Sequence, residues 1–198
     1  MLSHEPHATA LLLVDFQQGF DDPRWGRRNN PTAEQRASEL LRAWRATGRP
    51  VIHVRHMSTD PLSPLRPGQS GNAFKPETEP IAGEAVIEKR VNSAFIGTSL
   101  EADLRRGRCF GLVIAGLTTN HCVSTTARMA GNLGFVTWVV SDATAAFNRV
   151  GPDGFPYPAE QVHAMSLSDL HGEFATVVDT RAVIDALQAL QPASRRAS

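Results

Sequence analysis

The sequence predicts an α/β fold, a three-layer α/β/α sandwich built on a mostly parallel six-stranded sheet. Short apolar runs alternate with helical patterns along the 198 residues. Such alternation is typical of a parallel sheet whose crossovers place helices on both faces. Several runs are apolar throughout rather than alternating, as strands covered on both faces are. We expect one domain over residues 1–190, followed by a flexible tail at 191–198.

The expected strands are six apolar runs separated by helical or turn-forming segments. They are "ALLLVD" at 10–15, "VIHVR" at 51–55, "AVIEK" at 85–89, "FGLVIAG" at 110–116, "FVTWVVS" at 135–141 and "FATVVD" at 174–179. The long stretch at 56–83 is irregular and rich in Pro, Gly and Ser. Loops of this length in compact domains are usually functional or disordered, so we expect this one to wall a pocket or an oligomer contact. A second turn-rich loop, at 147–158, is expected to cover the site or to meet another subunit.

The first helical segment follows the first strand and has a clear apolar stripe. The stripe consists of Ala33, Ala37, Leu40, Leu41 and Trp44. Thr32 and Gln35 have the spacing of a capping box at its start. Gly48 followed by Pro50 predicts its end. We therefore expect a helix here that buries its stripe against the sheet.

Further helices are expected between the later strands. "TSLEADLRRG" carries a second pair with capping-box spacing, Thr98 and Glu101. "YPAEQVHAMSLSDLHG" has Pro158 near its first turn and Gly172 at its end. A last helix is expected near 180–190.

Charge and composition exclude several classes of partner. Lys plus Arg and Asp plus Glu both number 20, so net charge attracts neither nucleic acid nor an acidic membrane. No apolar run approaches the length of about 20 residues that a membrane span needs, and the start lacks the features of a signal peptide. Two cysteines without regular spacing make neither a disulfide framework nor a zinc pattern. We expect a cytoplasmic protein that binds a small-molecule substrate.

An acid, a base and a thiol come at the ends of three separate strands. Asp15 ends the first, Lys89 ends the third, and the fourth runs through "GLTTN" into Cys122. Ligands of open parallel sheets bind outside the carboxyl ends of the strands, so we expect these side chains at one edge. Each also has a structural interpretation: Asp15 as a cap, Lys89 as a solvated strand end, Cys122 as a small buried hydrophobe. Their joint placement favours a site.

Cys122 has the expected surroundings of a nucleophile. If the following helix begins around 120–122, the thiol lies in its first turn, where free N–H groups favour an anion. Together with a nearby Lys89 ammonium, this lowers a thiol pKa from about 8.5. Asp15 opposes ionisation, but it can take the thiol proton and later deliver one to a leaving group. The small residues of "GLTT" let N–H groups point at a developing oxyanion.

These motifs resemble those of the isochorismatase-like cysteine hydrolases, which include nicotinamidase, N-carbamoylsarcosine amidase and isochorismatase. The matching segments are "ALLLVDFQQGF", "VIEKRVNSAFIGTSL", "VIAGLTTNHCVSTTARMAGNLGF" and "VVSDATAAF". The resemblance implies that Asp15, Lys89 and Cys122 form a catalytic triad. It also implies a cis peptide bond at Leu117–Thr118, which would aim the N–H groups of Thr118 and Cys122 into an oxyanion hole.

Residues near the triad in sequence are candidates for binding the substrate. They are Phe20, Trp25, Asn92, Phe95 and His121. Phe20 and Phe95 also suit packing, and His121 either contacts substrate or faces solvent. Asn120 stands where many relatives carry Asp, which removes a charge beside the nucleophile.

We expect no metal and no other cofactor. Several relatives, nicotinamidases above all, hold a metal with Asp and His near the end of the second strand. Here "HVRH" offers His53 and His56, with Asp60 beyond. Residues three apart on a strand point to opposite faces, so the two histidines make no chelate unless the strand ends between them. Cys109 opens the fourth strand far from its carboxyl end and is expected to be an inert thiol.

The resemblance implies a cysteine hydrolase that cleaves a C–N bond of a small amide, ureide or carbamoyl substrate through a thioester. An alternative is isochorismatase-type hydrolysis of a vinyl ether, which needs the acid but not the thiol. Another is a non-catalytic scaffold that keeps the fold for assembly. An intact Cys122 favours the amidase, and the complete triad counts against the scaffold. The resemblance also implies a homo-oligomer, a dimer or a tetramer.

Overall fold

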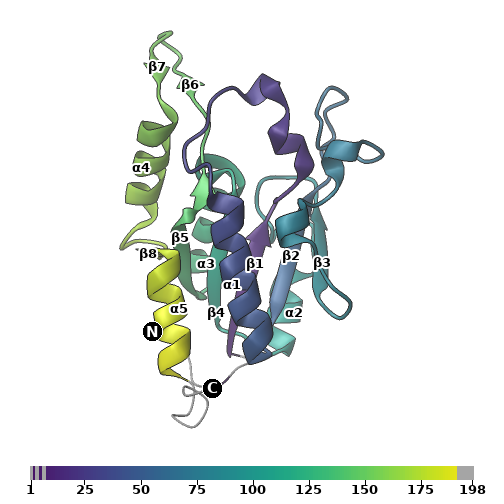
Figure 1. The fold of residues 1–198 in the computed structure, drawn as a ribbon, viewed down its shortest axis with the longest axis vertical. Helices are drawn as coiled ribbons and strands as arrows, with labels where there is room; N and C mark the ends of the chain where they lie inside the picture. Colours follow the sequence, from purple (N-terminus) through teal and green to yellow (C-terminus); the bar gives the residue numbers. More distant parts are fainter. Residues whose placement is uncertain (1, 3–4, 6–7, 191–198) are drawn as a thin grey trace.

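The central sheet consists of six parallel strands, whose arrangement is drawn in Figure 1. The computed structural model describes residues 2, 5 and 8–190. The order of the strands in the sheet is β3-β2-β1-β4-β5-β8. The strands are β1 (Thr9–Val14), β2 (Val51–His56), β3 (Ala85–Lys89), β4 (Gly111–Leu117), β5 (Val136–Ala145) and β8 (Thr176–Val178). All six expected strands are present, and every pairing in this sheet is parallel.

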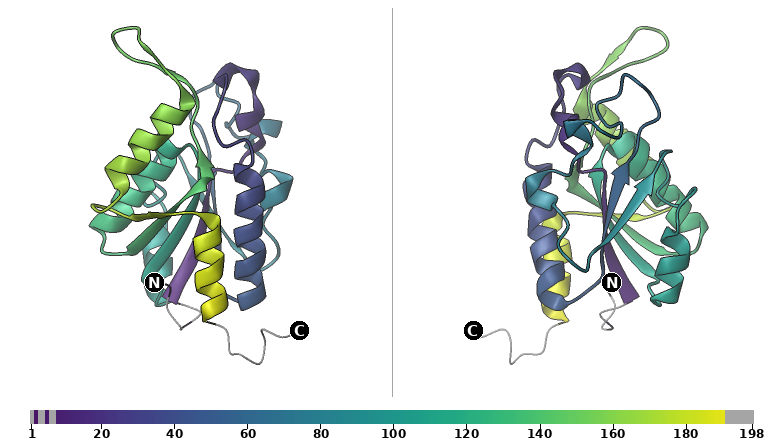
Figure 2. Two further views of the ribbon diagram at one scale, coloured as in Figure 1. Left: turned by 60° about the vertical axis from the view of Figure 1, so that its left-hand side comes forward. Right: turned by 90° about the vertical axis from the view of Figure 1, so that its right-hand side faces the viewer.

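Helices cover both faces of the sheet (Figure 2). On one face, α1 (Ala33–Thr47) and α5 (Thr180–Ala189) pack with the strands into one apolar core. On the other, α2 (Leu100–Arg106), α3 (Ser124–Asn132) and α4 (Ala159–Leu170) form a second core. This arrangement confirms the predicted three-layer α/β/α sandwich.

Strand β1 shows why its sequence is apolar at every position. Leu11 and Leu13 belong to the core on the α1 side, whereas Ala10, Leu12 and Val14 belong to the core on the α2 side. None of the five is more than 1% exposed. Alternate side chains of a strand point to opposite faces, so a strand covered on both sides needs an apolar residue at each step.

The helix ends follow the predictions only in part. The stripe of α1 is buried as expected, and Gly48 ends the helix in the left-handed region with φ of 65°, which glycine adopts without strain. The two capping boxes are wrong. Thr32 makes no side-chain cap and has ψ of 12° rather than the extended backbone of an N-cap. Thr98 Oγ1 accepts from Leu100 N at 3.3 Å, but Glu101 does not complete the pair, and Ser99 precedes α2.

The two long loops contain short ordered elements. Residues 147–158 include an antiparallel hairpin of β6 (Arg149–Val150) and β7 (Pro156–Tyr157), which projects beyond α4 at the carboxyl end of the sheet (Figure 1). The loop 56–83 contains two single turns of 3-10 helix, Ser70–Asn72 and Pro76–Thr78. The hairpin therefore stands at the edge where the site was predicted, whereas the loop 56–83 leaves that edge at the end of β2 and returns to the opposite end of the sheet at the start of β3.

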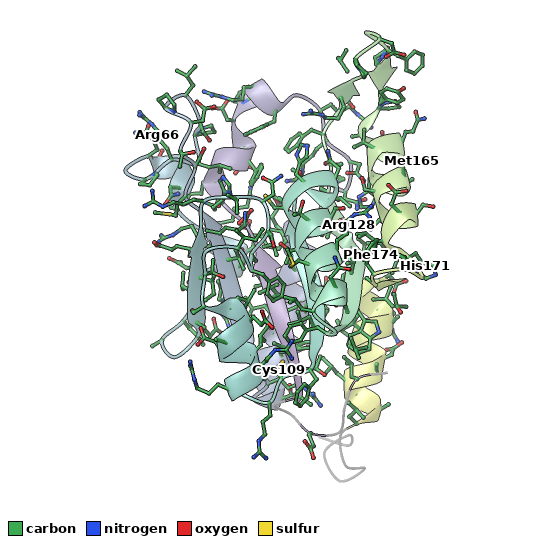
Figure 3. All side chains as sticks on the ribbon, turned by 180° about the vertical axis from the view of Figure 1, so that it is seen from behind. Arg66, Cys109, Arg128, Met165, His171 and Phe174 are labelled. Carbon is green, nitrogen blue, oxygen red and sulfur yellow. The ribbon has the colours of Figure 1, made fainter. Side chains whose placement is uncertain are left out.

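Both thiols are free and buried, at opposite ends of β4. Cys109 lies at the end of the sheet away from the β6–β7 hairpin (Figure 3). Burial raises the pKa of its thiol, so this sulfur stays protonated and unreactive at neutral pH. The expected tail at 191–198 lies outside the described residues. Within the described part of the chain, no helix combines the length and the apolar character that crossing a membrane requires.

Candidate active site

The acid, the base and the thiol that the sequence placed at strand ends lie in contact. Lys89, the last residue of β3, donates from Nζ to Asp15 Oδ2 at 2.6 Å and to Cys122 Sγ at 3.2 Å. The side chains of Lys89 and Asp15 are completely buried, and Cys122 is 8% exposed. A solvated strand end and a simple cap are thereby excluded as the roles of Lys89 and Asp15.

The sheet order explains how residues so far apart in sequence meet. β2 lies between β1 and β3, so the Lys89 side chain must reach across β2 to Asp15. The β2 residue paired with Lys89 is His56, and its Nδ1 lies 2.9 Å from Lys89 Nζ. From the sequence, His56 was interpreted only as a possible metal ligand, and its contact with Lys89 was not predicted. Its position at the end of the strand between the other two was the available signal.

The Lys89 ammonium uses all three of its N–H donors, on Asp15, His56 and Cys122. Burial, and after it the charge of Lys89, lowers the pKa of His56, while Asp15 opposes this. The imidazole is therefore neutral at pH 7. Because Nδ1 accepts from Lys89, the ring proton is assigned to Nε2.

The expected lowering of the Cys122 pKa is wrong. Burial is the largest effect and raises the pKa of the thiol; the charge of Asp15 raises it further, and Lys89 only partly compensates. Loss of water disfavours the charged form of a buried group even when a cation lies nearby, and the degree of burial cannot be predicted from the spacing of residues in the sequence. The resting sulfur is thus a protonated thiol. Within the described residues, Asp15 Oδ1 is buried without a hydrogen-bond partner, so it is available to accept a proton.

The nucleophile sits on a tight, well-supported turn. Thr119–Val123 forms a π-helical turn before α3 rather than the first turn of an α-helix, and the Leu117–Thr118 peptide bond is cis. Gly116 is required at the entrance, because a Cβ there would lie 2.2 Å from Val14 O. Behind the turn, Thr119 Oγ1 lies 2.8 Å from Nδ1 of the buried His163 on α4. This contact between the turn and α4 was not predicted from the sequence.

A cavity of about 560 Å³ has Cys122 in its wall, within the range of small-molecule sites. Four of the predicted substrate-binding residues line it, namely Phe20, Trp25, Asn92 and His121, together with Thr118 of the predicted oxyanion hole. Phe95 does not. Its ring stacks on Phe135 at 5.8 Å between centroids and packs against the core under α2 and α3. The prediction for Phe95 was wrong because the turn after β3 directs this residue away from the site, although it is close to Lys89 in sequence.

One wall of the cavity is aromatic. The Phe20 ring centroid lies 5.5 Å from that of Trp25, and Phe147 lies 6.3 Å from Phe20 and 5.9 Å from Trp25. Leu65, from the loop 56–83, also lines the cavity, which confirms that this loop walls a pocket. Phe147, Arg24 and Arg149 were missed as lining residues, since they come from loops whose course the sequence does not reveal.

The possible metal ligands do not fit a cation. Among the described residues, Asp15, His56 and Cys122 form the group whose donor atoms come within 4.8 Å of one another. The Lys89 ammonium contacts all three side chains, so a metal ion would face a full positive charge at the same point. His53 bonds instead to a glutamate, at 2.8 Å, and does not join the group.

Comparison with known proteins agrees with the fold. The isochorismatase domain model matches residues 9–182. The isochorismatase family protein YrdC of Bacillus subtilis is 48% identical over 176 residues, covering 89% of this chain and 94% of YrdC. An isochorismatase-family structure from Chromobacterium violaceum has a TM-score of 0.91 and 49% identity, covering 95% of this chain and 97% of that one.

A more distant structure is named for its activity. N-carbamoylsarcosine amidase from Thermoplasma acidophilum has a TM-score of 0.70 and 27% identity, covering 87% of this chain and 96% of its own. The fold, the sheet edge and these relatives define the class of the protein as a hydrolase built on a three-layer α/β sandwich. The chain belongs to the isochorismatase family.

Proposed function

We propose that the protein is an amidohydrolase that cleaves a C–N bond of a small amide, ureide or carbamoyl substrate through a thioester on Cys122. The observation that carries this proposal is the contact of the Cys122 thiol with the Lys89 ammonium, beside a buried Asp15 carboxylate whose Oδ1 is unpartnered within the described residues. A cavity of small-molecule size opens onto the same sulfur. The likeness to an N-carbamoylsarcosine amidase supports C–N chemistry in particular.

In the first half-reaction, Cys122 Sγ attacks the carbonyl carbon of the substrate. Asp15 takes the thiol proton as the S–C bond forms, which avoids releasing a thiolate into an apolar environment. The carbonyl oxygen becomes an oxyanion, for which the backbone N–H groups of Thr118 and Cys122 are the proposed donors. Asp15 then gives its proton to the leaving nitrogen as the C–N bond breaks. Ammonia or an amine departs, and the acyl group remains on sulfur.

In the second half-reaction, water replaces the departed nitrogen. Asp15 accepts a proton from the water as its oxygen attacks the thioester carbon. The S–C bond then breaks, the acid product forms, and the sulfur recovers the proton from Asp15. The thiol and the carboxylate return to their starting states, so the cycle balances without a cofactor.

Lys89 acts on both partners of this proton transfer. Its ammonium lies 2.6 Å from Asp15 Oδ2, which orients the carboxylate and leaves Oδ1 for the proton. It also lies 3.2 Å from Cys122 Sγ, where a positive charge stabilises negative charge that develops on sulfur. Since the thiol pKa is raised at rest, this stabilisation matters only while the proton is moving.

The proposal is tested by a screen for ammonia release from nicotinamide, ureido acids, biuret and maleamate. We expect turnover of at least one class by the wild type and none by Cys122→Ala, with an acyl adduct on the wild type detectable by intact mass. Ammonia release by Cys122→Ala at the wild-type rate would overturn the thioester route. A wild type that releases no ammonia but hydrolyses a vinyl ether would favour the isochorismatase-type reaction, and a folded wild type that hydrolyses neither the amides nor the vinyl ether would favour the scaffold.

A further inference from the structure

The cavity beside Cys122 carries positive charge that no acidic lining residue balances. Its described lining includes two arginines, Arg24 and Arg149, and no aspartate or glutamate. Asp15 is not one of the lining residues, and its carboxylate is engaged with Lys89 at 2.6 Å. A ligand that enters this cavity therefore meets a surplus of positive charge.

The two arginines differ in their partners. Arg24 forms an ion pair with Asp22 at 3.1 Å and donates from Nη1 to Leu62 O at 2.5 Å, so its charge is compensated and its position held. Arg149, the first residue of β6, is exposed, and its side chain has no ion pair or hydrogen bond within the described part of the chain. All five N–H donors of its guanidinium remain available.

Arg149 also stands close to the reacting end of the cavity. Partial burial, and after it the positive charge of Arg149, lowers the pKa of His121, the neighbour of Cys122. His121 lines the same cavity. Phe147, two residues before Arg149, belongs to the aromatic wall. The guanidinium, the aromatic wall and the thiol thus border one space.

We propose that Arg149 binds a carboxylate of the substrate, which makes the substrate a short amide or ureide with an anionic group at the end remote from its scissile C–N bond. This inference rests on the proposed function and narrows it. A planar guanidinium matches a carboxylate with two parallel hydrogen bonds. The apolar part of such a molecule would lie along the aromatic wall while its carbonyl reaches Cys122. Arg149 is a specificity residue in this proposal and takes no part in bond making.

The test compares substrates that differ only in the charge of the remote group. Succinamate and maleamate carry a carboxylate, whereas succinamide and maleamide carry a neutral amide in its place. We expect the wild type to have a lower KM for each anion than for its neutral partner. Arg149→Gln should raise KM for the anions roughly tenfold, with little change in kcat, and leave the neutral partners within about twofold. Arg149→Lys keeps the positive charge but not the planar guanidinium, so its KM for the anions should lie between those of the wild type and Arg149→Gln.

Arg108→Gln is the matched control, because it removes the same charge beside Cys109, at the opposite end of the sheet (Figure 3). It should leave all four KM values unchanged. Binding of succinate to Cys122→Ala, followed by calorimetry, gives a readout that needs no turnover. Arg149→Gln should weaken it roughly tenfold, added salt should weaken it in the parent protein, and Arg108→Gln should do neither.

The outcomes separate this inference from the proposed function. Equal losses for anionic and neutral amides in Arg149→Gln, or no preference for the anions in the wild type, would refute the carboxylate subsite while leaving the amidohydrolase intact. Succinate binding that is unchanged in Arg149→Gln would also refute the carboxylate subsite. If none of the amides releases ammonia but succinate binding depends on Arg149, the subsite stands and the proposed chemistry falls.

Discussion

Replacing His56 by phenylalanine tests whether the buried ammonium at the centre of the site needs its third acceptor. Lys89 Nζ lies 2.6 Å from Asp15 Oδ2, 2.9 Å from His56 Nδ1 and 3.2 Å from Cys122 Sγ. A phenyl ring occupies similar space but accepts no such bond, so His56→Phe leaves one N–H of a buried cation unpaired. A hydrogen bond to a charged group contributes about 1.5–3 kcal/mol. We expect the free energy of unfolding to fall by about that amount.

The same change should lower kcat/KM. An ammonium that has lost one anchor no longer holds the Asp15 carboxylate and the Cys122 sulfur in a fixed relation. If the whole of that energy is lost from the transition state, the rate falls roughly 10-fold to 150-fold. Urea unfolding followed by tryptophan fluorescence measures the first effect, and initial rates of ammonia release measure the second. His56→Gln, which restores an acceptor oxygen, is the matched control and should recover part of both.

The pH dependence of stability is a third test of the role of His56. Burial and the Lys89 charge hold the pKa of His56 below its ordinary 6.5, so the unfolded chain binds this proton more readily than the folded one. The contribution of neutral His56 is therefore complete above pH of about 6.5 and is lost as the pH falls toward the folded pKa. Between about pH 7 and about pH 5, the wild type should lose more stability than His56→Phe does. Unchanged stability and kcat/KM within twofold in His56→Phe would refute the whole reasoning about the third acceptor.

Two further changes test the proton transfer and the turn. Asp15→Asn should abolish hydrolysis and yet speed the alkylation of Cys122 by iodoacetamide at pH 7, because the Asp15 charge is one of the effects that raise the thiol pKa. The rate of labelling is measured by mass spectrometry. Slower labelling than in the wild type would contradict this prediction. Gly116→Ala should destabilise the fold by about 3 kcal/mol or more, since the new Cβ would lie 2.2 Å from Val14 O; thermal unfolding measures the loss, and an unchanged melting temperature would show that the strand end gives way freely.

The sheet and the three central residues were predictable for a specific reason. A continuous apolar run such as Leu11 to Val14 predicts a strand covered on both faces. The polar residue that ends the run is then expected at the edge of the sheet where the strand ends. Parallel strands place their carboxyl ends together, so Asp15, Lys89 and the turn of Cys122 share that edge whatever the order of the strands. To predict that residues share an edge of the sheet, only the positions of the strand ends are needed, and these are local features of the sequence.

What the sequence did not predict depends on order, register and burial. His56 contacts Lys89 because β2 lies between β1 and β3, and spacing within the chain does not contain that order. Phe95 follows Lys89 closely in sequence but packs against Phe135 in the core. The direction of the Cys122 pKa shift was misjudged, because proximity to a cation can be guessed from motifs whereas loss of water cannot.

The raised thiol pKa and the buried ammonium are two aspects of one electrostatic arrangement. A cation as deeply buried as Lys89 is tolerated only with full hydrogen bonding, and its three partners come from the end of β1, the end of β2 and the turn after β4. Saturating the ammonium therefore fixes the distance between the Asp15 carboxylate and the Cys122 sulfur. A thiol that is protonated at rest needs a base at a fixed distance more than it needs a low pKa. The anchoring of Lys89 by His56 accordingly bears on reactivity as directly as on stability.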